Sequence, residues 1–345
     1  MPKSQYVDPG KVFEPGYIKF HDIPVCQYNL SLDDEKRIYS KSDFIRIYRD
    51  MAVIREFETM LNDIKTKSVY NGVEYSNPGP AHLSIGQEAS AVGEAYCLDI
   101  NDYTFGSHRS HGEILAKGLS AIHKLSDNEL YTIMKEFLGG SILKVVEGTE
   151  EVRGNVKELA IDFLLYGALA EVFARTTGFN RGLGGSMHAF FIPFGIFPNN
   201  AIVGGSAGIA LGAALYKKSN AKKGIVVANC GDGAMGRGPV LEALNMSAMD
   251  QIRELWDRDG GMPILFNIFN NHYGMGGQTA GETMGWKMAA RIGAGVNPEQ
   301  MHAERVNGYD PLAVIDAFAR KKELLVRGEG PALLEVVTYR VSGHS

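Results

Sequence analysis

The most constraining feature of this chain is the alternation of short, largely apolar segments with helical patterns in its second half. The apolar segments cover residues 224–230, 263–269 and 332–339, and helical patterns lie near 239–256 and 311–327. Continuous apolar strands separated by helices are typical of a parallel sheet that is buried on both faces. The sequence therefore predicts an α/β fold with helices on both faces of a parallel sheet.

The first half of the chain is read mainly as helices. Residues 1–41 contain scattered prolines and predict an irregular arm, whereas apolar residues at three- and four-residue steps predict a helix from Ser42 to about Lys65. A second helix is expected to begin near Gln87. Residues 201–216 also read as a helix, and its glycines at four-residue spacing indicate close packing against a neighbour.

Composition excludes several classes of protein. Lys and Arg number 35 and Asp and Glu 40 among 345 residues, a net charge of −5, so nothing favours nucleic-acid binding. Residues 182–216 carry no charged side chain, but prolines and asparagines interrupt them, which argues against a membrane span. The 3 cysteines lie far apart, and a cytoplasmic, reducing compartment fits them best.

The segment 224–230 leads into Gly231-Asp232-Gly233, with Pro239 at an expected helix start. Ligands of open α/β sheets bind beyond the carboxyl ends of strands, where glycines let backbone N–H groups approach phosphate oxygens. An aspartate would repel a phosphate unless a divalent cation such as Mg²⁺ joined the two. The alternative is an ordinary Asp-Gly turn.

The segment 263–269 ends in a second polar group, Asn270-Asn271-His272-Tyr273-Gly274. An asparagine side-chain oxygen and the Tyr273 carbonyl are neutral ligands that would complete an Mg²⁺ site. The paired asparagines would otherwise cap a turn. Because both groups follow strands expected to be neighbours, a metal and diphosphate site is the favoured interpretation.

GDG followed by NNxYG resembles the thiamine-diphosphate motif, and the chain is similar to the alpha subunits of the decarboxylating component of 2-oxoacid dehydrogenase complexes, including pyruvate and acetoin dehydrogenases. The resemblance covers roughly residues 42–345 and implies the thiamine-diphosphate-binding fold. The matching stretches are HLSIGQEA (82–89), FGSHRSHGEILAKG (105–118), GLGGSMH (182–188), AIVGG (201–205), GDGAMGRG (231–238), EALNMSAM (242–249), NNHYGMG (270–276) and RVSGHS (340–345).

The resemblance implies a set of residues that bind the cofactor. Asp232, Asn271 and the Tyr273 carbonyl would hold Mg²⁺, with Gly233 and Ala234 at the diphosphate.

A second group of expected cofactor contacts precedes these in the chain. Arg109 matches a diphosphate-binding arginine. His108 stands where tyrosine is usual, and Ala201, which replaces a common glycine, and Val203 match positions that pack around the cofactor.

The resemblance also implies two catalytic histidines, His82 and His344, since histidine holds or moves a proton near neutral pH. His111 and His188 lie in matching motifs too; each is either a further site residue or a hydrogen-bonded loop histidine, and His111 is the better candidate. Glu88 lies in the alpha-type GQEA motif and is not expected to be the glutamate that activates the cofactor.

The implied function is the metal- and diphosphate-binding half of a thiamine-diphosphate-dependent 2-oxoacid or acetoin dehydrogenase. Such an enzyme decarboxylates its substrate and reductively acylates lipoyl groups on a partner acyltransferase. A beta-type subunit, or a fused beta domain, would supply the activating glutamate, and a heterotetramer is expected. The alternatives are a transketolase-like ketol transferase and a non-catalytic cofactor-binding subunit.

The chain also departs from the family pattern in length. The chain has extra residues at about 121–166, expected to form a helical surface insertion in the domain 42–345. Relatives continue beyond the GHS motif, so the chain is expected to be a fragment or the leading part of an alpha–beta fusion.

Overall fold

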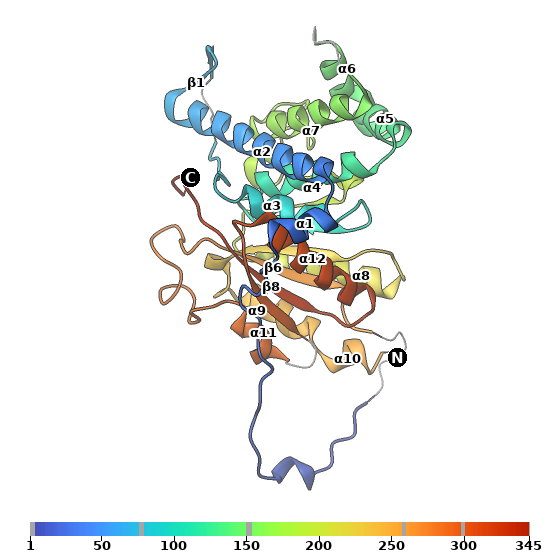
Figure 1. Ribbon diagram of the computed structural model, residues 1–345, viewed down its shortest axis with the longest axis vertical. Helices are drawn as coiled ribbons and strands as arrows, with labels where there is room; N and C mark the ends of the chain where they lie inside the picture. Colours follow the sequence, from blue (N-terminus) through green and yellow to red (C-terminus); the bar gives the residue numbers. More distant parts are fainter. Residues whose placement is uncertain (1–3, 76–78, 150–153, 257–259, 298–300, 345) are drawn as a thin grey trace.

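The computed structural model describes residues 4–75, 79–149, 154–256, 260–297 and 301–344. A six-stranded, wholly parallel sheet with the strand order β4-β3-β5-β6-β8-β7 forms its centre (Figure 1). The predicted α/β class is therefore confirmed. The strands are β3 (Tyr103–Phe105), β4 (Ile196–Phe197), β5 (Val226–Gly231), β6 (Ile264–Asn270), β7 (His302–Asn307) and β8 (Ala332–Val337).

Successive residues of the central strands point to opposite faces of the sheet, and both faces are buried. Val226 and Ala228 of β5 pack in one core cluster with residues of α8, α9 and α11, whereas Val227 packs on the other side with Leu98 and residues of α12. Burial on both faces explains why these strands read as continuous apolar runs. These helices are α8 (Gly205–Ser219), α9 (Gly238–Ser247), α11 (Arg291–Val296) and α12 (Pro311–Val326), with α10 (Asp250–Arg253) following α9.

A second layer, made of helices that include α3 (Glu88–Tyr96), packs beside the sheet and fills the upper part of Figure 1. The segment around 121–166 contributes helices to this layer, and its Leu130, Ile142 and Phe163 are each 0% exposed in the helical core. That it is an insertion stays a prediction. The helices of this layer are α2 (Lys41–Lys67), α3 (Glu88–Tyr96), α4 (His111–Lys124), α5 (Asp127–Glu136), α6 (Ser141–Glu147) and α7 (Val156–Val172).

Two predicted helices have different bounds in the structure. The helix expected over 201–216 begins only at Gly205, because Gly204 has a φ of +82° and cannot continue a right-handed helix. Gly208 and Gly212 face open space, so the close neighbour that we expected at these two glycines is not among the described residues. The helix expected over 239–256 ends at Ser247, although Pro239 lies in its first turn as predicted.

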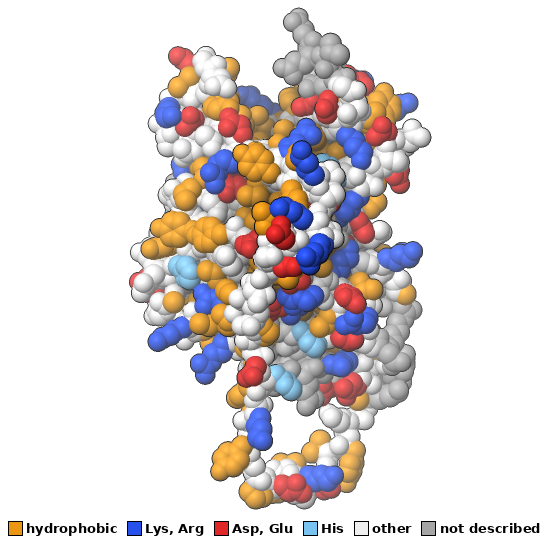
Figure 2. Space-filling model, viewed as in Figure 1, with side chains coloured by type: hydrophobic (Ala, Val, Ile, Leu, Met, Phe, Trp, Pro, Cys, Tyr) orange, Lys and Arg blue, Asp and Glu red, His pale blue; other side chains and the backbone are white. Residues whose placement is uncertain are grey.

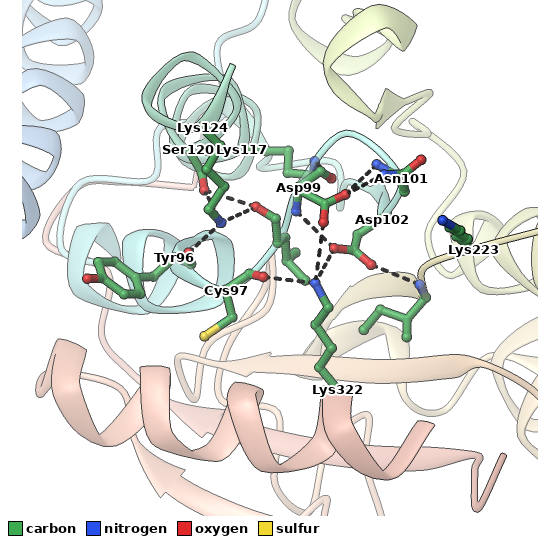
Figure 3. A network of polar contacts seen from close by, with 12 residues as sticks. Tyr96, Cys97, Asp99, Asn101, Asp102, Lys117, Ser120, Lys124, Lys223 and Lys322 are labelled. Atoms are coloured by element: carbon green, nitrogen blue, oxygen red, sulfur yellow. Dashed lines mark hydrogen bonds and ion pairs between the residues drawn. The ribbon is translucent and has the colours of Figure 1, made fainter. Parts of the chain in front are cut away.

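Lysine side chains fix the turn between α3 and β3 (Figure 3). Lys322 of α12 donates to the Cys97 carbonyl at 2.9 Å and to the Asp102 carboxylate at 2.6 Å. Asp102 is 0% exposed and also accepts the Ile225 N–H at 2.9 Å, while Lys124 donates to the carbonyl of Tyr96 at 2.6 Å. The network therefore joins α12, the α3–β3 turn and the start of β5.

The N-terminal arm stands clear of the body in Figure 1, and Figure 2 shows apolar side chains along it. Phe13 is 84% and Tyr17 95% exposed. The arm then reaches a short helix that we did not predict, α1 (Leu32–Ile38), and a small hairpin of β1 (Val69–Tyr70) and β2 (Val73–Glu74) follows α2. Within the described ranges, no helix has the length and apolar character needed to cross a membrane.

Candidate functional site

A cavity of about 400 Å³ lies at the carboxyl edge of the sheet. The structure brings all the predicted site residues into its wall, although they come from six separate segments of the chain. These residues are His82, His108, Arg109, Ala201, Val203, Asp232, Gly233, Ala234, Asn271, Tyr273 and His344.

Strand order explains why residues so far apart in sequence meet here. β5 runs directly into Asp232, β6 into Asn271, and the short strand β3 is followed by His108 and Arg109. β5 pairs with both β3 and β6, so the three carboxyl ends lie side by side. The loops after β4 and β8 reach the same cavity, and His82 enters from the loop before α3.

Asp232 is a nearly fully buried carboxylate, 1% exposed. The Thr279 hydroxyl donates a hydrogen bond to its Oδ2 atom. Burial raises the pKa of Asp232, and the Thr279 hydrogen bond opposes that rise. A desolvated carboxylate of this kind is stabilised by a cation, so its surroundings fit a metal ligand.

The two adjacent asparagines have different tasks. Asn270 donates from Nδ2 to Glu335 Oε1 at 2.6 Å and accepts the His272 N–H on Oδ1 at 3.1 Å, so both ends of its amide are used inside the protein. Asn271 instead lines the cavity, and its Oδ1 accepts only the Tyr273 N–H at 3.2 Å within the described chain. Asn271 is thus the residue of the pair that is available to a ligand.

The backbone around Asp232 leaves room for a ligand. A Cβ added at Gly231 or Gly276 would meet no atom within 4 Å, and one at Gly233 would meet only ordinary contacts from 3.7 Å. Gln87 also lines the cavity, and its Oε1 is buried without a hydrogen-bond partner. Open backbone and an unsatisfied acceptor together fit a polar bound group that supplies a donor.

Three arginines give the cavity a positive wall, and only Arg109 was assigned from the sequence. Arg109 is buried and donates at 2.7 Å to the Leu83 and His344 carbonyls. Burial, reinforced by Arg340, lowers the pKa of Arg109 to about 10, so it remains charged at neutral pH. Arg237 and Arg340 also line the cavity. Arg237 lies in the GDGAMGRG stretch and Arg340 in the RVSGHS stretch, both of which carry the resemblance. These motifs could therefore have marked the two arginines as candidate site residues.

Three histidines lie together on this wall. The ring of His82 is 5.1 Å from that of His108 and 5.2 Å from that of His344, between ring centres. Burial lowers the pKa of His82 to about 3 and that of His108 to about 4, with neighbouring histidines and Arg109 acting in the same direction. The pKa of His344 is lowered by burial and then by Arg109 and Arg340. All three are therefore neutral at pH 7.

His111 and His188, the other two candidates, do not line the cavity. His111 is buried between Glu58, 2.8 Å from its Nδ1, and the Ser186 hydroxyl, 2.7 Å from its Nε2. His111 is thus the hydrogen-bonded histidine of our alternative interpretation. Glu88 is held by Arg55, with 2.6 Å between Arg55 Nε and Glu88 Oε1. That Glu88 does not act on the cofactor stays a prediction.

Sequence reasoning missed Glu171, which shapes the glycine-rich loop behind the cavity. Its carboxylate is 0% exposed and accepts four backbone N–H groups, those of Asn180 and Gly182 on Oε2 and those of Gly184 and Gly185 on Oε1. This loop leads to Met187, which lines the cavity. No local pattern marks Glu171, because its four partners lie 9 to 14 residues further along the chain.

Comparison with known proteins agrees with this geometry. The family described as "Dehydrogenase E1 component" matches residues 146–345. Among similar proteins, the alpha subunit of the Chaetomium thermophilum mitochondrial pyruvate dehydrogenase E1 component is 29% identical over 332 residues, covering 96% of this chain and 64% of the relative. The chain thus spans just under two thirds of that relative's length.

Two bacterial relatives are covered more fully. The alpha subunit of acetoin:2,6-dichlorophenolindophenol oxidoreductase from Bacillus subtilis is 30% identical over 91% of this chain and 73% of the relative. The alpha subunit of the pyruvate dehydrogenase E1 component from Rhizobium meliloti is 28% identical over 89% of this chain and 70% of the relative. From its fold, its cavity and these similarities, the chain belongs to the dehydrogenase E1 component family.

Proposed function

We propose that this chain is the metal- and diphosphate-binding half of a thiamine-diphosphate-dependent 2-oxoacid or acetoin dehydrogenase. The observation that carries the proposal is the buried Asp232 carboxylate, which shares one cavity with Asn271, the open backbone at Gly233 and the Arg109 guanidinium. Oxygen ligands suit Mg²⁺, and glycine N–H groups with an arginine suit a diphosphate. The family membership supports the same assignment.

Each residue would have a defined task. Asp232, the Asn271 side chain and the Tyr273 carbonyl would hold Mg²⁺, and Gly233, Ala234 and Arg109 would bind the diphosphate.

The other wall residues would act beside them. Ala201, Val203 and His108 would pack against the cofactor, which supplies the carbanion chemistry when bound. Neutral His82 and His344 would donate a hydrogen bond to a substrate oxygen or exchange a proton with it.

The proposed enzyme requires a partner. A beta-type subunit or domain would supply the glutamate that activates the cofactor, and a lipoyl group on an acyltransferase would accept the acyl product. We therefore expect no decarboxylation by this chain alone. Turnover of a 2-oxoacid by the purified chain would contradict this division of labour.

Calorimetry tests the cofactor half of the proposal directly. Thiamine diphosphate is titrated into the purified chain with Mg²⁺, and then into Asp232→Asn and the exposed control Asp127→Asn. We expect Mg²⁺-dependent binding that is at least about tenfold weaker in Asp232→Asn, because a buried charged metal ligand is lost, and unchanged in the control. Equal affinity of the two variants, or no binding by the unaltered chain, would overturn the proposal.

The two alternative functions differ in what they predict. A non-catalytic cofactor-binding subunit would show the same Mg²⁺-dependent binding but no turnover of a 2-oxoacid, even with a beta-type partner present. A ketol transferase gains no support from the similar proteins, because the matched family is a dehydrogenase component.

A further inference from the structure

The three histidines of the cavity wall form a cluster with the spacing of a metal site. One ring nitrogen each of His82, His108 and His344 lies within 4.8 Å of the other two. The residues come from three separate segments: the loop before α3, the turn after β3 and the segment after β8. Their meeting is therefore a product of the fold and not of local sequence spacing.

We propose that His82, His108 and His344 form a site for a divalent transition-metal ion of the Zn²⁺ class. Imidazole nitrogen suits Zn²⁺, whereas Mg²⁺ prefers oxygen, so this site is chemically distinct from the oxygen ligands at Asp232 and Asn271. Three protein ligands with a fourth position open to solvent or ligand is a familiar zinc arrangement. The adjoining cavity supplies that open position.

The state of the rings agrees with this site. His82 Nδ1 is buried and has no hydrogen-bond partner among the described residues, so one lone pair or N–H group of this ring is unsatisfied. By contrast, both ring nitrogens of His111 already have partners. Tetrahedral zinc with Zn–N distances of about 2.1 Å places its ligands roughly 3.4 Å apart. The three rings must therefore turn slightly inward to close on an ion.

Positive charge nearby limits the affinity. The Arg340 Nη1 and Arg109 Nη2 atoms lie 3.2 and 3.5 Å from His344 Nδ1, and Lys65 adds to their field. Arginine only donates, so Nδ1 is the acceptor of these long contacts and the ion must displace them. We therefore expect weaker binding than in a closed structural zinc site, and tighter binding once Arg340 is neutralised.

The consequence for activity rests on the proposed function. His82 and His344 are the residues expected to meet the substrate, so an ion bound to both would block them. Zinc would thus act as an inhibitor. His108 is decisive, because without its imidazole only two nitrogen ligands remain.

Metal titration of the chain without cofactor tests the site separately from the proposed function. Metal-free protein is titrated with ZnCl₂ by calorimetry, and with CoCl₂ while the visible absorption of tetrahedral Co²⁺ is recorded. The variants are His108→Tyr, His82→Gln and Arg340→Gln, with the exposed His188→Gln as the matched control. Circular dichroism verifies that each variant is folded.

We expect one equivalent of Zn²⁺ to bind, with affinity at least tenfold lower in His108→Tyr and His82→Gln, higher in Arg340→Gln and unchanged in His188→Gln. Asp232→Asn should bind zinc normally while losing Mg²⁺-dependent binding of thiamine diphosphate, which separates the two proposals. Absence of zinc binding, or equal affinity in wild type and both histidine variants, would overturn the inference.

Discussion

Replacing Glu171 by glutamine should destabilise the protein far more than an ordinary loss of one charge. The carboxylate accepts two backbone N–H groups on each oxygen, at 2.7 and 2.9 Å on Oε2 and at 2.6 and 3.3 Å on Oε1. In glutamine one oxygen becomes an NH₂ group, so two N–H donors face another donor whichever way the amide turns. Each hydrogen bond to a charged group contributes about 1.5–3 kcal/mol.

The loss of two such bonds lowers the free energy of unfolding by about 3–6 kcal/mol. This is a large part of the roughly 5–15 kcal/mol that holds a typical domain folded. Urea denaturation followed by circular dichroism measures the change, and Glu136→Gln on the exposed face of α5 is the matched control, expected within about 0.5 kcal/mol of wild type.

Hydrogen exchange locates the effect. The amides of Asn180, Gly182, Gly184 and Gly185 should exchange much faster in Glu171→Gln, because their acceptor is lost, while amides of the central strands keep their relative protection. A destabilisation below about 1 kcal/mol would refute our account of Glu171, given the bond strengths above. Unchanged protection of these four amides would refute it as well.

Three further predictions concern the interior. Burial raises the pKa of Glu94 to about 8 from an ordinary 4.5, so the stability that protonated Glu94 contributes is complete below pH 4.5 and is lost as the pH rises toward 8. Glu94→Gln should therefore flatten the fall in the free energy of unfolding between pH 5 and pH 9. An unchanged slope in the variant would contradict this role of Glu94. Lys322→Met leaves the Asp102 carboxylate buried without its cation and should lower the free energy of unfolding, measured by urea denaturation, by about 3 kcal/mol. A decrease below about 1 kcal/mol would disprove the stabilising role of the Lys322–Asp102 ion pair. Gly224→Ala should lower the melting temperature, because Gly224 has a φ of +80° and the added Cβ would lie 2.3 Å from a backbone carbonyl oxygen. Gly212→Ala should raise it, because Gly212 lies inside α8 and the added Cβ would meet no atom within 4 Å. The reverse order of melting temperatures would show the steric argument to be wrong.

The sequence predicted the part of the fold that is coded locally. The strands β5, β6 and β8 were found because burial on both faces makes them continuous apolar runs. The edge strand β7 was missed because its sequence, HAERVN, is polar: its Glu304 is buried only through ion pairs with Arg320 and Lys321 of α12. Such pairing depends on a helix that follows in sequence and leaves no periodic signal.

The candidate site was predictable to the extent that its residues lie in motifs. Asp232, Asn271 and Arg109 were assigned and line one cavity in the structure, although their binding roles stay predictions. Glu171 and the Thr279 hydroxyl on Asp232 escaped notice because each acts across a distance in sequence. Residue type alone does not reveal a carboxylate whose partners are backbone amides.

The arginine-lined cavity also ties the behaviour of the folded protein to its solvent. Like charges gathered at Arg109, Arg237 and Arg340 repel one another when nothing anionic neutralises them. Any small polyanion that binds there therefore favours the native state by mass action, and the stabilisation grows with the logarithm of its concentration once the site is largely occupied. Melting temperatures recorded in phosphate buffer will exceed those recorded in a buffer without a polyanion. Values from the two buffers are therefore not directly comparable.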